Sequence, residues 1–236
     1  MAPGRPEGHE IKKLEAGSVD EPPDLYDPSY LRALFDEMAG SYERVNLITS
    51  FGFSERWRRR AVDRLELRRG AIVHDWMTGM GEGWGRILRR IGPDGRLVAT
   101  DLSPGMLAHA EPRRTRWADH DLTVIEGDVL DNDTPDDSVD AVVCLFGIKT
   151  LSPDQCRRFA RELRRVLRPG GRFSVVEVSV PPSRVLRAPY SFYLKRVIPI
   201  LGRLMLGDPE NYRMLGIYAD RFGDCRQLVM ELRAAG

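Results

Sequence analysis

Five short apolar runs, separated by segments with helical periodicity, dominate the middle of the sequence. Strands that alternate with helices through short connections pair in parallel, because each helix returns the chain across the sheet in a right-handed crossover. The pattern therefore predicts an α/β fold with a Rossmann-like, doubly wound, mostly parallel sheet. The expected strands are residues 71–76, 96–102, 122–129, 138–147 and 172–180.

The segments on either side of these strands have different patterns. Residues 1–24 are rich in proline, glycine and charge, which is typical of a mobile tail. Within residues 25–69 apolar side chains recur at three- and four-residue spacings, so we expect a cap of N-terminal helices. Residues 181–218 are aromatic and helix-prone, and we interpret them as a helical lid inserted after the fifth strand. We expect residues 25–236 to form a single domain.

Composition narrows the class of protein. The 236-residue chain has a formal net charge of +1, which gives no electrostatic reason to expect a nucleic-acid partner. Its three cysteines are widely spaced and include no C-x-x-C pair, so we predict no metal site. An odd number of cysteines and no recognisable signal peptide predict a cytoplasmic location. No apolar run approaches the roughly 20 residues of a membrane span.

The first expected strand runs into a glycine-rich stretch, VHDWMTGMGEG, at residues 73–83. Gly79 and Gly81 would let the backbone approach a ligand beyond the carboxyl end of the strand, where open parallel sheets bind their ligands. Asp101 ends the second strand 20 residues after Gly81, where a carboxylate can accept the hydroxyl groups of a ribose. This combination predicts a nucleoside cofactor, with a purely structural tight turn as the alternative.

Other residues argue against a dinucleotide. The third glycine of a G-x-G-x-x-G signature falls at Trp84, and Asp75 would repel a pyrophosphate. A carboxylate instead suits a cationic ligand such as S-adenosylmethionine, which carries a sulfonium and an amino group. Asp128, with Val129 after it, follows the third strand; it fits either a contact to the adenine amino group or an ordinary turn.

Several blocks of the sequence resemble the class I S-adenosylmethionine methyltransferases. More narrowly, they are similar to the UbiE/COQ5 family, which C-methylates ubiquinone and menaquinone precursors. The resemblance covers about residues 30–235. The blocks that carry it are LFDEMAGSYERVNLITSFGFSERWRR (34–59), DLSPGML (101–107), FGIKTL (146–151), LRRVLRPGGRF (163–173), VEVSVP (176–181) and PYSFYLKRVIPILGRLMLGDPENYRML (189–215).

This resemblance implies the class I fold, a methyltransferase of biosynthesis and S-adenosylmethionine as its cofactor. Together with the loop, it assigns candidate residues by position. The candidates for cofactor binding are Asp75, Thr78, Gly79, Gly81, Glu82, Asp101, Leu102, Met106, Gly127, Asp128, Val129 and Leu145. Met106 fits a core position equally well. The candidates for the substrate pocket are Trp76, Phe146, Tyr190, Tyr193 and Tyr212.

Methyl transfer requires an oriented acceptor and the loss of a proton, and the catalytic candidates are Lys149, Tyr42 and Glu177. Lys149 stands where the family has arginine; it keeps the charge, and a desolvated lysine can act as a base. Glu177 lies in an apolar strand, where a buried carboxylate either lines a pocket or is paired.

Two departures from the sequence pattern of the family bear on the identity of the methyl acceptor. Lys149-Thr150 and Ile217-Tyr218 replace the R-N and E-S pairs of the family. We therefore expect C-methylation of a hydrophobic or aromatic small molecule, quinol-like or polyketide-like, in specialised metabolism. O- or N-methylation remains open, as does a cyclase or binding protein that transfers no methyl group, because the fold does not define the acceptor.

The insertion mixes apolar and basic residues, which allows two interpretations. It is either an amphipathic lid in peripheral contact with a membrane surface, or a cap helix packed on the domain or in a homodimer interface. The family also has two further strands after the position of Gly236. The sequence leaves open whether this sheet is shorter or the chain given is incomplete.

Overall fold

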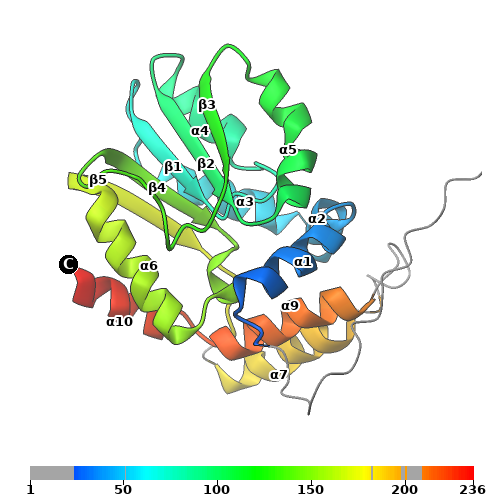
Figure 1. The fold of residues 1–236 in the computed structure, drawn as a ribbon. Coiled ribbons are helices and arrows are strands. Elements are labelled where there is room, and N and C mark those ends of the chain that lie inside the picture. The colour runs from blue at the N-terminus through cyan, green and yellow to red at the C-terminus, as the bar shows by residue number, and fades with distance from the viewer. Residues whose placement is uncertain (1–23, 51, 182, 198–199, 201–208) are drawn as a thin grey trace, which may run out of the picture.

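A computed structural model describes residues 24–50, 52–181, 183–197, 200 and 209–236. Its centre is a five-stranded sheet of order β3-β2-β1-β4-β5 in which every neighbouring pair is parallel (Figure 1). The strands are β1 (Ile72–Trp76), β2 (Arg96–Asp101), β3 (Asp121–Glu126), β4 (Val139–Leu145) and β5 (Leu167–Val176). This arrangement confirms the predicted Rossmann-like, doubly wound fold.

The strand order places a ligand site. The sheet begins at central β1, extends outward through β2 and β3, and then continues on the other side of β1 with β4 and β5. The connections after β1 and β4 therefore leave in opposite directions, and a crevice opens at the carboxyl ends of the strands.

Helices cover both faces of the sheet because successive strand side chains alternate between faces. On one face, α3 (Phe53–Asp63), α4 (Trp84–Ile91) and α5 (Pro104–Arg116) enclose a core cluster that includes Val143. On the other face, α6 (Pro153–Val166) and α10 (Arg226–Ala235) enclose a cluster that includes Val142. Both valines are almost fully buried.

Serine caps position the helices that follow the strands. The hydroxyl of Ser103 accepts the backbone N–H of Met106 at 3.0 Å, with Pro104 at the first helical position of α5. Ser152 and Gln155 form a reciprocal capping box at the start of α6. Such caps satisfy backbone donors at the helix end and thereby fix the residue at which each helix begins. Both helices begin beside the crevice.

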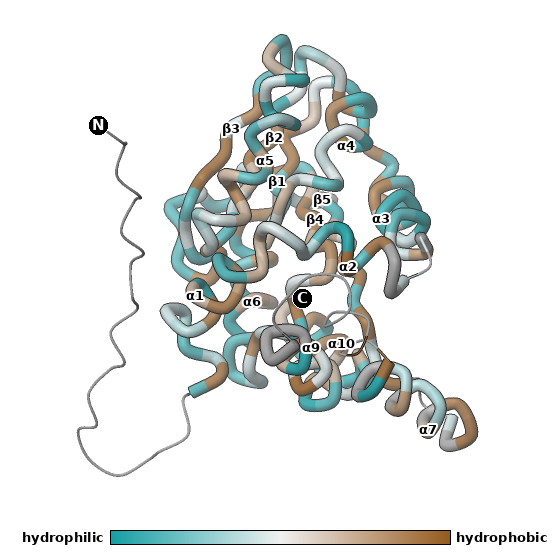
Figure 2. The backbone as a smooth tube through the Cα atoms, turned by 90° about the vertical axis from the view of Figure 1, so that its right-hand side faces the viewer, coloured by the Kyte–Doolittle hydropathy of each residue, from teal (hydrophilic) through white to brown (hydrophobic). Residues whose placement is uncertain are grey.

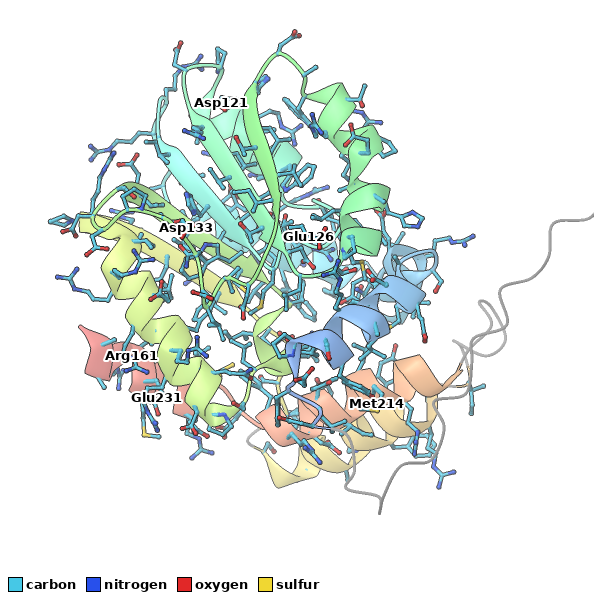
Figure 3. All side chains as sticks on the ribbon, viewed as in Figure 1. Asp121, Glu126, Asp133, Arg161, Met214 and Glu231 are labelled. Atoms are coloured by element: carbon cyan, nitrogen blue, oxygen red, sulfur yellow. The ribbon has the colours of Figure 1, made fainter. Side chains whose placement is uncertain are left out.

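The N-terminal helices α1 (Pro28–Met38) and α2 (Tyr42–Thr49) pack with α9 (Pro209–Phe222) at the crevice end of the sheet (Figure 1). Their shared cluster includes Leu34, Met38 and Met106, and Met214, labelled in Figure 3, packs against it. The cap thus joins segments that are far apart in the sequence.

The insertion after β5 contains α7 (Arg184–Phe192), a π-helical segment (Tyr193–Val197) and the start of α9, as predicted. Figure 2 shows α7 projecting from the rest of the fold, and Val185 and Phe192 on it are 82% and 64% exposed. The predicted tail, apart from Asp24, and residues 198–199 and 201–208 of the insertion lie outside the described residues. Among the described helices, none is long and apolar enough to cross a membrane.

The largest difference from the expected elements is at β5. This strand begins at Leu167 rather than residue 172, and its register with β4 jumps between Val139 and Ala141. The Pro169-Gly170-Gly171 stretch forms an irregularity inside the strand instead of preceding it. Proline and glycine are tolerated there because bulged positions leave the ladder pairing.

Candidate active site

A cavity of about 870 Å³, part of it open to solvent, lies at the carboxyl ends of the strands. We call it the cofactor cavity. Of the predicted cofactor-binding residues, all except Asp75 and Gly81 line it: Thr78, Gly79, Glu82, Asp101, Leu102, Met106, Gly127, Asp128, Val129 and Leu145. Its size suits a small organic ligand.

Backbone donors fix the carboxylate of Asp101 at the edge of this cavity. Gly79 donates its N–H to Oδ2 at 2.7 Å, and Ser103 donates its N–H to Oδ1 at 2.9 Å. Burial raises the pKa of Asp101 to about 6, although these two hydrogen bonds favour the ionised form. Gly79 has a φ of +57°, a conformation that a residue without Cβ adopts readily.

Asp75 lies immediately behind the loop and is almost fully buried. Its Oδ2 accepts the hydroxyl of Thr78 at 2.6 Å, and Thr78 in turn accepts the indole N–H of Trp84 at 2.7 Å. Its Oδ1 is buried with no hydrogen-bond partner among the described residues. Burial, with a smaller contribution from the carboxylates of Glu82 and Asp101, raises the pKa of Asp75 to about 7.

These acids suit a cationic ligand. Asp75, Glu82 and Asp101 are close enough for their charges to affect one another, and Asp75 has an unused acceptor. Like charges held together favour a bound cation, whereas they would repel a phosphate.

Gly81 does not line the cofactor cavity but allows the backbone turn within the loop. It has a φ of +76°, and a Cβ on it would lie 2.4 Å from the indole ring of Trp84. Trp84, at the position of the missing third glycine, therefore fills the space that Gly81 leaves.

Asp128 supports both sequence interpretations. Its Oδ1 accepts the N–H of Leu130 at 2.9 Å, which is ordinary turn geometry, and the residue also lines the cofactor cavity. Met106 is similar, since it lines the cavity and is only 2% exposed in the core.

Helix α1 closes one side of the cofactor cavity, which the sequence analysis did not foresee. Oδ1 of Asp36 accepts the hydroxyl of Ser103 at 2.6 Å and the N–H of Gly105 at 2.8 Å. Arg32 of α1 also forms an ion pair with Glu126 at the end of β3, labelled in Figure 3. Asp36 belongs to the N-terminal block of residues 34–59. The sequence does not show which residue an acidic side chain on a helix surface will contact.

A second cavity, of about 1370 Å³ including space open to solvent, adjoins the first. We call it the acceptor cavity. Tyr42, Arg58 and Phe146 line both cavities. The other lining residues are Val45, Asn46, Ser50, Ser54, Trp57, Lys149, Val176, Glu177, Val178, Ser179, Tyr190, Tyr193, Leu215, Gly216 and Ala219.

Lys149 and Glu177 form a buried ion pair in the acceptor cavity. Lys149 lies on a 3₁₀ turn (Ile148–Thr150) after β4, and its Nζ is 3.2 Å from Oε1 of Glu177. Their side chains are 6% and 1% exposed. The Glu177 carboxylate also accepts the backbone N–H groups of Lys149, at 3.1 Å, and Val178, at 2.7 Å. Glu177 therefore both lines the pocket and is paired.

This pairing argues against Lys149 as the base. Burial is the largest single influence on the pKa of Lys149 and lowers it, but the charge and hydrogen bond of Glu177, together with the nearby Tyr42 and Cys144, outweigh burial and raise the pKa above its ordinary value. The side chain is thus an ammonium group at neutral pH, and it also donates to the carbonyl of Phe146. It is suited to stabilise negative charge rather than to accept a proton.

Two predicted substrate residues are not part of either cavity as described. Trp76 is 1% exposed and packs edge-to-face on Phe159 of α6, with ring centroids 5.3 Å apart. Alternation along β1 sends its side chain to the helix layer, opposite Asp75. The side chain of Tyr212 lies outside the described residues. Tyr190 and Tyr193 line the acceptor cavity as expected.

The departure at Ile217-Tyr218 has a packing explanation. Tyr218 is fully buried, donates its hydroxyl to the carbonyl of Leu25, and meets Tyr26 edge-to-face at 6.2 Å. Its side chain therefore ties α9 to the segment before α1. It does not line the acceptor cavity and gives no information about the acceptor.

Arg58 is the main residue that the sequence analysis missed. It is 9% exposed, lies on α3, and its Nη2 donates to Oε1 of Glu82 at 2.9 Å. Its guanidinium carbon lies 5.2 Å from the ring centroid of Phe146. Nothing in the sequence distinguishes this buried arginine from the exposed arginines around it.

Comparison with known proteins agrees with this geometry. Residues 25–236 match the model of the ubiE/COQ5 methyltransferase family. The demethylmenaquinone methyltransferase of Thermus thermophilus is 34% identical over 86% of this chain and 90% of its own length. The ubiquinone/menaquinone biosynthesis C-methyltransferase UbiE of Hahella chejuensis is 32% identical over 79% of this chain and 75% of its own length.

Among solved structures, a SAM-dependent methyltransferase from Thermotoga maritima has a TM-score of 0.59, with 19% identity over 87% of this chain and 80% of that chain. At this level of identity the similarity shows the fold alone. The family model and the sequence relatives show more: the chain belongs to the ubiE/COQ5 methyltransferase family, and it is an S-adenosylmethionine-dependent methyltransferase.

Proposed function

We propose that this enzyme methylates a ring carbon of a hydrophobic, phenolic or quinol-like aromatic molecule. The observation that carries the proposal is the junction of two cavities at Tyr42, Arg58 and Phe146. One cavity is rich in carboxylates, and the other combines aromatic walls with a buried ammonium group. The relatives, a ubiquinone/menaquinone biosynthesis C-methyltransferase and a demethylmenaquinone methyltransferase, support an acceptor of this class.

In this proposal the cofactor cavity binds S-adenosylmethionine through three acids at successive strand ends. Asp101 accepts hydrogen bonds from the ribose hydroxyls, and Asp128 accepts one from the adenine amino group. The unused Oδ1 of Asp75, directly behind the loop, accepts one from the amino group of the ligand. The carboxylates also favour the positive charge of the sulfonium.

The donor supplies an activated methyl group, so the protein mainly orients the acceptor and stabilises its charge. The acceptor reacts as a phenolate, whose hydroxyl proton has gone to solvent. A ring carbon next to the C–O⁻ group attacks the methyl carbon, the new C–C bond forms, and the electrons of the S–C bond go to sulfur. The proton of that ring carbon then passes to a water molecule, which restores the aromatic ring.

Lys149 holds the phenolate oxygen in this scheme. An ammonium group beside a developing or fixed negative charge in a buried site stabilises it strongly. Glu177 acts as the positioning residue for Lys149, because its oxygens also accept two backbone N–H groups. Tyr42, at the junction, supplies a wall between acceptor and donor.

The lysine itself supports an acceptor different from the quinols of the relatives. A guanidinium binds two oxygens in one plane, whereas an ammonium is a compact point charge. We therefore place the enzyme in specialised metabolism, with an acceptor that presents a single charged oxygen at this position.

We further propose that α7 contacts an anionic membrane surface and that the hydrophobic acceptor enters the acceptor cavity from that surface. Val185, Leu186 and Phe192 are exposed on α7, next to the cavity-lining Tyr190. The insertion carries several basic residues, which suits such a surface. Co-sedimentation with anionic but not neutral vesicles is the expected result. A stable dimer by size-exclusion chromatography, with no vesicle binding, would instead assign these side chains to an interface.

The main test is calorimetric titration with S-adenosylmethionine and S-adenosylhomocysteine, followed by turnover on two acceptor sets. One set contains naphthohydroquinones like those of the relatives, and the other contains phenols with a single hydroxyl group. We expect product with a new C-methyl group by mass spectrometry and NMR, with the second set preferred. A methyl group on oxygen or nitrogen would refute C-methylation, and binding without turnover on either set would favour a protein that transfers no methyl group.

A further inference from the structure

Arg58 occupies a position that the proposed transfer does not use. Its side chain is 10% exposed, faces both cavities, and pairs with Glu82 of the cofactor loop, whose side chain is 12% exposed. Glu82 lies beside the loop glycine, since a Cβ on Gly79 would be 3.7 Å from its Oε2. The pair therefore connects α3 of the cap directly to the loop.

The surroundings of this pair are dominated by acids. The negative charge of Glu82 raises the pKa of both Asp75 and Asp101, and the positive charge of Arg58 opposes the effect at Asp75. Arg58 thus offsets part of the negative charge of the cofactor cavity. The guanidinium carbon of Arg58 also lies 5.2 Å from the centroid of the Phe146 ring, a cation–π contact that helps to fix the position of the guanidinium.

The donor and its product differ in one respect that this charge balance would sense. S-adenosylmethionine carries a methyl group and a positive charge on its sulfur, and S-adenosylhomocysteine has a neutral sulfur without that methyl group, while their other groups are identical. A change in the ratio of their affinities when a nearby charged residue is replaced therefore reports a change in the electrostatic potential at the sulfur.

We propose that Arg58 is a positioning residue that holds Glu82 in the cofactor cavity and, through the net charge of the pair, sets how strongly the site prefers the charged donor over the neutral product. Without Arg58 the cavity is more negative and retains the donor more strongly than the product. Without Glu82 the unbalanced guanidinium disfavours the sulfonium. This inference rests on the proposed assignment of the cofactor cavity.

The test is isothermal titration of both ligands at about pH 8, where the carboxyl groups with raised pKa values are largely ionised. Arg58→Met should raise the donor-to-product affinity ratio on the order of three- to tenfold, and Glu82→Gln should lower it by a similar factor. Arg58→Lys should stay near wild type. The double variant Arg58→Met/Glu82→Gln should return towards it, because removing both charges leaves the net charge of the pair unchanged.

Arg86→Met is the matched control. Arg86 also pairs with a carboxylate, Asp63, at 2.6 Å, but it lies outside both cavities and should leave the ratio unchanged. If Arg58→Met does not fold, Glu82→Gln and Arg58→Lys alone decide the question. Ratios that stay at the wild-type value in both Arg58→Met and Glu82→Gln would overturn the role of the pair while leaving the cofactor cavity intact. A wild-type protein that binds neither ligand would overturn the cavity assignment and this inference together.

Discussion

The hydroxyl of Thr78 donates to one oxygen of Asp75, at 2.6 Å, and the other oxygen of that buried carboxylate has no partner in the part of the chain described. An unsatisfied buried acceptor costs about 1–3 kcal/mol, more when it is charged. The protein thus maintains a buried carboxyl group with a free acceptor next to its cofactor cavity, and we infer that a bound ligand supplies the missing donor.

The first prediction concerns pH and the donor. Because the pKa of Asp75 is about 7 in the free protein, its carboxyl group is largely neutral below that pH. A cationic ligand binds the ionised form, so the affinity for S-adenosylmethionine should rise between about pH 6 and about pH 8. Calorimetric titration across this range checks it. Asp75→Asn should bind weakly and show a flatter profile; a wild-type affinity that is independent of pH would exclude this role for Asp75.

The second prediction concerns stability. The pKa of Asp75 is raised in the folded state from about 3.8 to about 7, so its favourable contribution is full below the lower value and is lost as the pH rises through the upper one. The ligand-free protein should therefore lose stability over this window. Asp75→Asn should remove much of the loss and raise the melting temperature at about pH 8. Urea denaturation of both proteins at two pH values measures it, and a destabilised variant at high pH would contradict it.

The third prediction concerns the ion pair between Lys149 and Glu177, whose loss should reduce stability and turnover but not the affinity for the cofactor. Lys149→Met leaves Glu177 buried without its partner and should cost about 3–5 kcal/mol of stability. Lys149→Met/Glu177→Gln should recover most of that stability but not the turnover. Both variants should keep the wild-type affinity for S-adenosylhomocysteine, because Lys149 lines only the acceptor cavity. Lys149→Arg is the conservative control, and retained turnover in Lys149→Met would remove this lysine from the mechanism.

The fourth prediction concerns Asp101. Its two backbone donors, Gly79 and Ser103, hold it in place before any ligand arrives. Asp101→Ala should weaken the binding of both S-adenosylmethionine and S-adenosylhomocysteine by about 1–3 kcal/mol, since the ribose is common to the two ligands. The loss should be larger for S-adenosylmethionine, because the variant also removes a negative charge from the cavity. An unchanged affinity for S-adenosylhomocysteine would show that Asp101 contacts no group that the two ligands share.

The strands, the loop and the acids at strand ends could be predicted because their signals are local. Apolar runs and glycine-rich turns need no knowledge of distant residues, and Gly79, Asp101 and Asp128, which they indicate, line one cavity in the structure. The error at Trp76 is also local in origin. The position of Trp76 beside the loop suggests a pocket residue. Alternation along β1 instead directs its side chain away from Asp75 and into the core.

The parts that could not be predicted depend on contacts across the fold. Whether Lys149 acts as a base or an ammonium depends on Glu177, which is on another strand end 28 residues away. Arg58 and Asp36 each meet a partner on a different helix or loop, and the same residue types on an exposed helix face look identical in sequence. Burial and pairing, which determine the charge of these groups, are therefore properties of the assembled cap and sheet.

The contact between Gly81 and Trp84 has a consequence for how this loop changes over evolution. Because a methyl group at position 81 would collide with the indole, and the indole N–H also supports Thr78, neither position can vary alone without loss. A Gly81→Ala change collides with the indole and also strains the backbone at a φ of +76°, and a smaller side chain at 84 relieves only the collision while it leaves the hydroxyl of Thr78 without its donor. Among related sequences, a tryptophan at the position of 84 should therefore occur together with glycine at 81, as a linked pair that is inherited or lost as one unit.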